Sequence, residues 1–394
     1  MAKFIIITLL AFSGYMTAAA QAPATEEVMQ AARRVNNYFM RMWLDPKKDT
    51  FVRGKNRPSS LWTRGVYYEG LMALYEIDPQ ERYLKYTDEW ADYHKWTPRY
   101  GTNTTHADDQ CCAQTYLDRY VMERDRRGDK STAYMTDSVR VNLEKQMATG
   151  KTDYWWWIDA IQMAMPVYAK MFAITGDRRY ILYARDCYEW TRNREGLSDG
   201  TGLWNPKEGL WWRDKSYKPP FKEFDGNNCY WSRGNGWVYE ALARTMQAID
   251  DSKTKDKEVA DFRNMMAQDF TAMSKTLAEC QREDGFWNVS LLSPTTYGGK
   301  ETSGTGLFLS GMAWGIRKGL LKEDTYDKTA DKAAEGLLRH AIAENGFLQW
   351  MQGTGAGPES SQPVLQGTIP DFEDYGAGCV LLGLVEYYKL RDRH

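Results

Sequence analysis

The chain has 394 residues, of which 43% are hydrophobic, so it is long enough to bury at least one large core. Its formal net charge is -2 with both signs mixed, which excludes a basic field able to hold nucleic acid or an anionic membrane surface. Six cysteines are too few for a disulfide scaffold, and four scattered histidines without a CxxC pair do not match zinc-site spacing. We therefore expect neither a metal nor a cofactor.

The amino terminus has the pattern of a secretory signal peptide. A basic start precedes the apolar run FIIITLLAFSGYM and the small residues TAAAQA. A membrane anchor would need roughly 20 continuous apolar residues, and Ser13, Gly14 and Thr17 interrupt this run. The sequence predicts a signal peptide over residues 1–22 and an exported protein, periplasmic or secreted, made of residues 23–394.

Apolar residues recur at three- and four-residue spacing along most of the chain, which predicts helices. Alternating runs typical of strands are almost absent. We expect helices over residues 24–43, 60–76, 80–95, 107–126, 132–148, 156–174, 178–193, 234–249, 257–282, 303–319, 326–343 and 374–391.

These helices repeat as hairpins. Tyr83 and Tyr86 recur as Tyr180 and Tyr183 in a similar context, at a separation of about two units of roughly 45 to 50 residues. An open solenoid would have polar capping repeats at both ends, whereas the last helix, YGAGCVLLGLVEYYKL, is apolar. The sequence therefore predicts an all-α protein, a closed (α/α)6 toroid of six hairpins in one domain, with its pocket where the inner helices begin.

Three long loops are expected over residues 194–233, 283–302 and 344–373. Each is rich in Gly, Pro, Asn or Trp, and loops of this length in a compact domain usually carry function. We expect them to surround one pocket.

Aromatic residues give the strongest compositional signal, with 16 Trp and 25 Tyr. Indole faces suit the C–H faces of sugar rings, although most of these rings should pack in the core. The consecutive residues Trp155, Trp156 and Trp157 cannot all face one core. At least one of them should face the pocket.

Two groups of carboxylates are candidates for acid–base chemistry. Asp159 follows Trp157 at the start of an apolar helix, where desolvation would raise its pKa toward that of a general acid. Helix capping is the alternative role. Asp108 and Asp109 open another helix, and one of them could supply the second carboxylate of a glycosidase while the other caps. Because Cys112 occupies the fifth position, the pair does not form a DDxxD motif.

The stretch YWSRGNGWVYEAL places Arg233 between Trp231 and Trp237. The planar fork of arginine suits a carboxylate, and residues 234–236 are expected to form a tight turn that uses the freedom of glycine. No GxGxxG or Walker lysine supports a phosphate loop. A structural pair with an acid such as Asp225 is the alternative to binding the carboxylate of a uronic acid.

Taken together, six stretches resemble the unsaturated uronyl hydrolases of glycoside hydrolase family 105 and the related family 88. They are HADDQCCAQTYL, WWWIDAIQMAMPVYAKM, GLWWRDKSY, YWSRGNGWVYEALA, DGFWNVSLLSPTTYGGKETSGTGLF and YGAGCVLLG. The resemblance implies an (α/α)6 barrel that acts on the 4,5-unsaturated uronic acid left by polysaccharide lyases. A carboxylic acid protonates C4, water adds at C5, and the hemiketal opens and expels the neighbouring sugar.

The resemblance also implies roles for individual residues. Asp159 matches the catalytic acid and base of the family, and Asp108, or less readily Asp109, matches its second carboxylate. The groups that hold the substrate correspond to Arg233 and Trp237. In addition, Trp157 matches an aromatic residue beside the catalytic acid.

One departure concerns Arg213, which stands where some members carry a histidine. Its side chain could bind a second carboxylate or a sulfate of the substrate. The leading hypothesis is removal of unsaturated galacturonyl groups from pectin fragments, with unsaturated glucuronyl ends as the near alternative. An inverting glycosidase that uses Asp159 and Asp108, and a sugar-binding toroid without catalysis, remain open. The expected partner is an oligosaccharide, rather than nucleic acid or a membrane.

Overall fold

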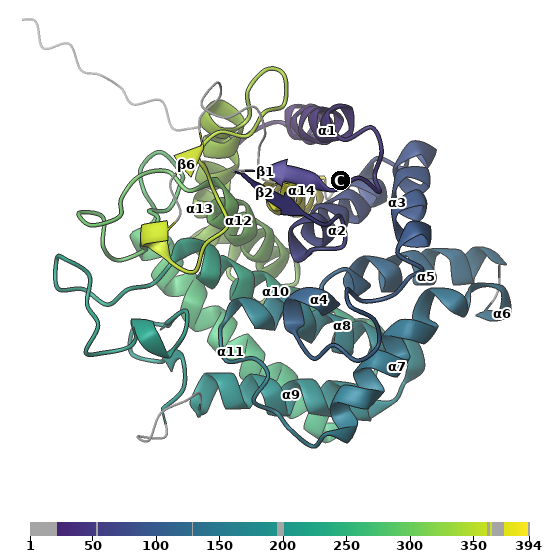
Figure 1. Ribbon diagram of the computed structural model, residues 1–394. Coiled ribbons are helices and arrows are strands. Elements are labelled where there is room, and N and C mark those ends of the chain that lie inside the picture. The colour runs from purple at the N-terminus through teal and green to yellow at the C-terminus, as the bar shows by residue number, and fades with distance from the viewer. Residues whose placement is uncertain are drawn as a thin grey trace, which may run out of the picture.

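The computed structural model describes residues 22–52, 54–127, 129–194, 201–360, 363–364 and 374–392. Twelve long helices of this part form two concentric rings (Figure 1). The inner helices are α2 (Trp62–Ile77), α5 (Ala113–Arg127), α8 (Asp159–Thr175), α10 (Ser232–Ser252), α12 (Thr302–Arg317) and α14 (Asp374–Arg391). The outer helices are α1 (Thr25–Met42), α3 (Glu81–Tyr93), α7 (Tyr134–Ala148), α9 (Arg178–Asn193), α11 (Lys257–Cys280) and α13 (Glu323–Gly336).

The inner ring is closed. Each inner helix contacts the next in chain order, and α14 packs against both α12 and α2, which joins the last hairpin to the first. The outer helices α3, α7, α9, α11 and α13 pack against α2, α5, α8, α10 and α12, while α1 packs against α14. The predicted (α/α)6 toroid is confirmed.

Burial explains the two kinds of helix. Outer helix α1 buries one stripe, which includes Val28, Ala32, Val35 and Phe39, and exposes polar residues elsewhere. Inner helix α12 is buried from Thr302–Ile316 without interruption, because it packs between neighbours on both sides. The repeated tyrosines occupy equivalent buried places on the outer helices α3 and α9, two hairpins apart.

Glycines allow the inner helices α2, α12 and α14 to approach closely. A Cβ added at Gly378 would lie 2.1 Å from the Val66 carbonyl oxygen, and one at Gly70 would lie 2.7 Å from the Gly378 Cα. A Cβ at Gly306 would lie 2.6 Å from the Cys379 carbonyl oxygen. Backbone therefore packs directly on backbone at this junction, which closes the ring.

We expect the substitution Gly378→Ala to destabilise the protein by about 3 kcal/mol, because the new methyl group forces α14 away from α2. Denaturant unfolding monitored by circular dichroism measures the loss. The neighbouring change Ala377→Gly, at a fully buried position of the same helix, should cost only about 1 kcal/mol through helix propensity. Equal losses for the two variants would contradict the close-packing argument.

Two predicted helices are interrupted. The helix expected over residues 107–126 is divided at Cys111 and Cys112 into α4 (Ala107–Gln110) and α5. The other, expected over residues 326–343, comprises α13 followed by a π-helical turn, η2 (Leu337–Ala341). One further short helix, α6, covers Asp129–Thr132.

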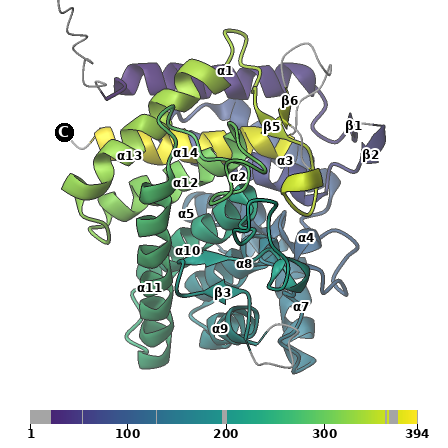
Figure 2. The same ribbon diagram turned by 90° about the vertical axis from the view of Figure 1, so that its left-hand side faces the viewer.

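Short strands and loops gather at one end of the barrel, where the inner helices begin (Figure 2). Three antiparallel pairs form there: β1 (Thr50–Val52) with β2 (Lys55–Arg57), β3 (Trp204–Asn205) with β4 (Leu210–Trp211), and β5 (Met351–Gln352) with β6 (Pro363–Val364). Short 3-10 turns, η1 (Lys215–Tyr217) and η3 (Pro358–Ser360), complete the loops. We call this end the amino-terminal mouth.

The predicted signal peptide lies outside the described residues, apart from Ala22. Within the described ranges, none of the helices has both the length and the apolar character needed to cross a membrane.

Candidate active site

Asp159 is the first residue of α8 and therefore lies at the amino-terminal mouth. Its Oδ2 is 3.3 Å from Nε of Arg213, and Nη1 of Arg213 also donates to Oδ2 of Asp214 at 2.6 Å. Backbone pairing supports this contact, because the Ile158 N–H donates to the Arg213 carbonyl at 2.9 Å. A cation therefore lies beside the carboxylate of Asp159 at the mouth.

Asp108 lies on α4, within electrostatic range of Asp159. Burial, followed by the negative charges of Asp159 and Asp109, raises the pKa of Asp108 to about 7, and the Arg213 cation opposes the rise. The side chain of Asp108 is 27% exposed, against 13% for Asp159. The carboxyl of Asp108 therefore holds a proton near neutrality, and the assignment of Asp159 as the catalytic acid stays a prediction.

The neighbouring residues Asp108 and Asp109 have different surroundings in the structure. Oδ2 of Asp109 accepts a hydrogen bond from the Thr104 hydroxyl at 2.7 Å, and its Oδ1 is 3.5 Å from Nη1 of Arg99. Asp109 is buried and stabilises the loop before α4. It therefore has a structural role, and Asp108 is the member that interacts with Asp159.

The three consecutive tryptophans point in different directions, as expected. Trp155 is fully buried, Trp157 is almost fully buried, and Trp156 is 47% exposed. The ring of Trp157 lies 4.6 Å from that of Trp156 and 4.9 Å from the ring of His106. The exposed face belongs to Trp156, which the sequence analysis did not select, and the Arg213 guanidinium lies 5.8 Å from its ring centre.

Arg233 is held inside the protein. It is 1% exposed, and its Nη1 and Nη2 donate to the Tyr375 hydroxyl at 2.6 Å and to the Gly353 carbonyl at 3.0 Å. Its guanidinium stacks 4.3 Å from the Trp231 ring. These partners, and not Asp225, occupy Arg233. Its Nε has no hydrogen-bond partner in the described part of the chain, and its substrate-binding role stays a prediction.

The two predicted sugar-binding tryptophans are also enclosed. Trp231 donates from Nε1 to Oε1 of Gln352 at 3.0 Å. Trp237 is fully buried and meets Trp62 and Tyr375 at ring distances of 6.0 and 6.2 Å. Both rings pack beneath the mouth, and their sugar-binding role stays a prediction.

The expected tight turn over residues 234–236 is wrong, because these residues form the first turn of α10. Gly236 is needed for packing: a Cβ there would lie 3.0 Å from Leu307 Cδ1 on α12. Asn235 accepts from the Trp211 N–H at 2.9 Å and donates to its carbonyl at 3.0 Å, which attaches β4 to α10. Helix packing, and not turn chemistry, explains the RGNG sequence.

Asp108, Asp159 and Arg213 together can perform acid–base chemistry on a charged substrate. Two interacting carboxyls can hold one proton between them, and the planar guanidinium of the arginine can bind an anion. Sequence reasoning missed His106 and Asp214, which have no local pattern that separates them from ordinary polar residues. It expected one of the three consecutive tryptophans to face the pocket but did not identify Trp156 as the exposed one. In the described ranges, no three His, Cys, Asp or Glu side chains have the arrangement of a metal site.

The chain resembles known proteins over most of its length. A protein of Formosa agariphila named unsaturated 3S-rhamnoglycuronyl hydrolase is 29% identical over 347 residues, covering 84% of this chain and 85% of that protein. A protein of the same name from an Alteromonas species is 28% identical over 357 residues, covering 85% and 79% of the two chains.

Comparison with solved structures agrees with the sequence similarity. The solved structure of a family 88 glycosyl hydrolase from Bacteroides vulgatus matches with a TM-score of 0.78 and 30% identity, covering 93% of this chain and 100% of that one. The sequence profile of Glycosyl Hydrolase Family 88 matches residues 31–391, which include all six inner helices and the amino-terminal mouth. The chain therefore belongs to glycosyl hydrolase family 88.

Proposed function

We propose that the protein removes a 4,5-unsaturated uronic acid from the non-reducing end of oligosaccharides that polysaccharide lyases produce. The observation that carries the proposal is the group of Asp108, Asp159 and Arg213 at one mouth of the barrel. Membership of family 88 and the two relatives named as unsaturated rhamnoglycuronyl hydrolases support it.

In the proposed reaction, the pair of carboxyls supplies one proton and activates one water. The carboxyl form of the pair protonates C4 of the vinyl ether, and the electron pair of the double bond forms the new C–H bond. Water adds at C5 as it gives up its own proton to a carboxylate. The resulting hemiketal opens to a ketone at C5, and the neighbouring sugar leaves with a proton.

Arg213 is proposed to bind the substrate carboxylate, because its guanidinium lies between Asp159 and the exposed ring of Trp156. In the free protein its charge is directed at Asp159 and Asp214. A uronate carboxylate that binds the guanidinium weakens its attraction for Asp159. Asp159 is the acid that the family resemblance implies, and Asp108 is its partner in the pair.

Rhamnose is proposed as the sugar released, because the names of both relatives contain rhamnose. Two versions remain: an unsaturated galacturonyl group from pectin, and an unsaturated glucuronyl group on a sulfated rhamnose. Both versions carry the uronate carboxylate proposed to bind Arg213, and in both a sugar ring could stack on the exposed face of Trp156 beside it.

A panel of lyase-generated disaccharides tests the function, with the ultraviolet absorbance of the conjugated double bond as the readout. We expect loss of absorbance with at least one rhamnose-linked substrate, and the faster of the galacturonyl and sulfated glucuronyl versions identifies the class. An unsaturated glucuronyl group on an amino sugar is the control for the linkage. Cleavage of saturated glycosides alone would contradict the proposal.

For Arg213→Ala we expect kcat/KM on the uronate substrate to fall by about 30- to 100-fold, the value of one or two hydrogen bonds to a charged group. The methyl ester of the same substrate has no charge and should lose much less. Lys215→Ala removes an exposed cation from the same loop and serves as the control. Equal losses on the acid and on its ester would show that Arg213 acts only through Asp159 and Asp214.

We also propose that the protein is exported. The basic, apolar and small-residue segments of residues 1–22 support this. A shorter mature chain in the periplasm or medium, beginning near Ala22, is the expected result of amino-terminal sequencing.

A further inference from the structure

A cavity of about 750 Å³ opens toward the opposite end of the barrel from Asp108 and Asp159. It is lined by the middle and carboxyl-terminal parts of the six inner helices. On α8, for example, Lys170 lines this cavity, whereas Asp159 begins the helix. The rise between them is about 16 Å. The cavity is therefore separate from the candidate active site.

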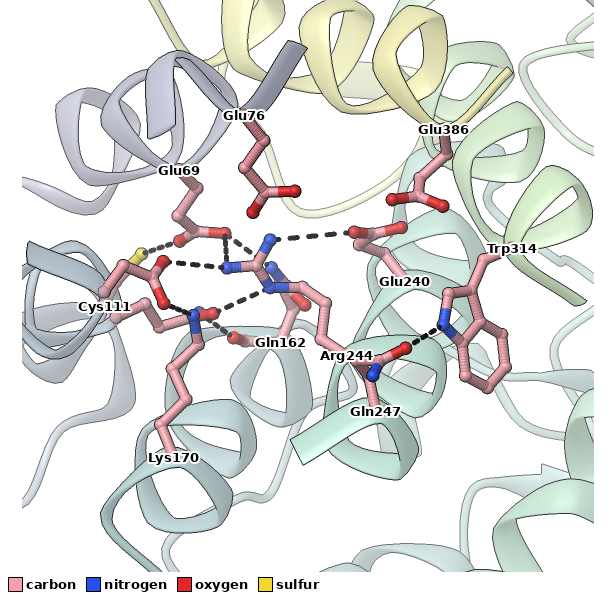
Figure 3. Close-up of polar contacts among 12 residues, drawn as sticks. Glu69, Glu76, Cys111, Gln162, Lys170, Glu240, Arg244, Gln247, Trp314 and Glu386 are labelled. Carbon is pink, nitrogen blue, oxygen red and sulfur yellow. Dashed lines mark hydrogen bonds and ion pairs between the residues drawn. The ribbon is translucent and has the colours of Figure 1, made fainter. Parts of the chain in front are cut away.

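Arg244 lies at the centre of the cavity (Figure 3). Its Nη2 is 3.9 Å from Oε2 of Glu69 and 3.8 Å from Oδ2 of Asp118, and its Nη1 is 3.9 Å from Oε1 of Glu240. Its Nε donates to the Gln114 side chain at 3.1 Å. The guanidinium thus faces three carboxylates without a close bond to any of them.

The inner part of the cavity has an excess of negative charge when its groups are ionised. Three carboxylates, Glu69, Asp118 and Glu240, face two cations, Arg244 and Lys170, and the ammonium of Lys170 is bonded to Asp118. One negative charge is left without a matching cation in this cluster. Taking a charge out of water is costly unless it is paired.

Glu240 is the member that lacks partners. It is 3% exposed, and its Oε2 has no partner with hydrogen-bond geometry in the described part of the chain, although the Ser310 hydroxyl favours its ionised form. Burial raises the pKa of Glu240 to about 7. By contrast, both oxygens of Glu69 are engaged, by Cys111 Sγ at 3.4 Å and by Gln162 Nε2 at 3.0 Å.

Toward the rim, cations outnumber carboxylates: the lining there includes Arg124, Arg317, Lys318 and Lys389 with Glu76, Asp251 and Glu386. Lys389 contacts Glu76 and Glu386, and Arg317 pairs with Glu386 at 2.6 Å. Trp314 donates from Nε1 to Gln247 at 3.0 Å. These pairs do not supply a partner for the free oxygen deeper in the cavity.

The remaining wall is apolar and suits a carbon skeleton. Side chains of Met72, Leu117, Val121 and Leu382 lie between the charged groups. The volume is in the range of small-molecule sites, which run from about 300 to 1,000 Å³. An anion bound to Arg244 would be repelled by the three carboxylates around it. An uncharged molecule would leave the excess negative charge of the inner cluster without a cation.

We propose that this cavity binds a small organic cation whose primary ammonium group pairs with Glu240. The ammonium supplies the missing positive charge and three donors, and the carbon chain lies against the apolar wall toward the rim. The proposal concerns a site separate from the hydrolase reaction and does not depend on it.

Calorimetric titration with 1,5-diaminopentane tests the proposal, with 1,5-pentanediol as the uncharged control of the same length. We expect saturable binding of the diamine and none of the diol. Glu240→Gln keeps the shape of the side chain and removes its charge, and it should weaken binding at least tenfold. Asp108→Asn at the other mouth should leave binding unchanged, which distinguishes this cavity from the acidic pair there.

A second variant tests the proposal independently, in case Glu240→Gln does not fold. Ala73→Leu narrows the cavity without changing a charge, and it should also weaken binding while circular dichroism stays native. Equal binding of diamine and diol, no binding of either, or diamine binding that Glu240→Gln leaves intact would overturn the proposal. Full competition by sodium or potassium chloride at equal concentration would also overturn it, because the site would then hold a simple ion.

Discussion

Asp159→Asn should remove almost all hydrolase activity while the protein stays folded. The amide cannot donate a carboxyl proton to C4 or accept one from water, so kcat should fall by at least about 1,000-fold. Binding of the unsaturated disaccharide should weaken little, since Arg213 remains. The absorbance assay measures kcat, and calorimetry with the inactive variant measures binding.

The matched control is Asp186→Asn, which changes an exposed carboxylate in the middle of the outer helix α9. It should retain full activity. Residual activity of Asp159→Asn above about one tenth of the native value would remove Asp159 from the chemistry. In that case Asp108, with its raised pKa, would be the acid throughout the reaction.

Asp108→Asn should lower kcat/KM by about 100-fold and also change its dependence on pH. In the free protein the pKa of Asp108 is about 7, so the form with one proton on the pair is present below that value. Activity of the native protein should therefore fall tenfold per unit as pH rises above about 7. The variant has no proton to lose at this position. The alkaline limb of the pH–activity profile, which is the fall in activity above about pH 7, should therefore disappear.

Asp109→Asn makes the same chemical change one residue away and separates the two roles. The negative charge of Asp109 helps to raise the pKa of Asp108, so its removal should move the alkaline limb to lower pH without abolishing it. The variant should also be less stable, because the bond from Thr104 and the contact with Arg99 are lost or weakened. An unchanged alkaline limb in Asp108→Asn would contradict the assignment.

Most of the fold could be predicted because helical periodicity is a local property. The twelve long helices follow from the spacing of apolar residues, and closure of the ring follows from the apolar last helix. The prediction failed where distant packing overrides local preference. Residues 234–236 read as a turn, yet contacts with Leu307 and Trp211 hold them in a helix.

The candidate site could be predicted only in part, for the same reason. Asp108, Asp159 and Arg213 lie in stretches that resemble the family, and the structure brings them together. The enclosure of Arg233 depends on Gly353 and Tyr375, more than one hundred residues along the chain. No local pattern reveals such partners, just as none shows that Asp109 has a structural role.

The sequence contains an indication of the cavity around Arg244 that the sequence analysis did not use. Inner helices of a toroid are buried on both sides and should be apolar, yet α2 carries Glu69 and α10 carries Glu240 and Arg244. Charged residues in helices of this kind need partners or a function. Whether these residues are paired or carry a function depends on the distances between helices, which cannot be obtained from the sequence.

The order of bond changes is the central claim, and an analogue in which a methylene group replaces the glycosidic oxygen tests it most directly. Hydration begins at the C4–C5 double bond, so the protein should bleach the absorbance of this C-glycoside although the link to the second residue cannot break. Asp159→Asn should leave it unbleached. Cleavage of the natural disaccharide combined with an intact chromophore in the bound analogue would contradict the account and indicate direct displacement at the anomeric carbon.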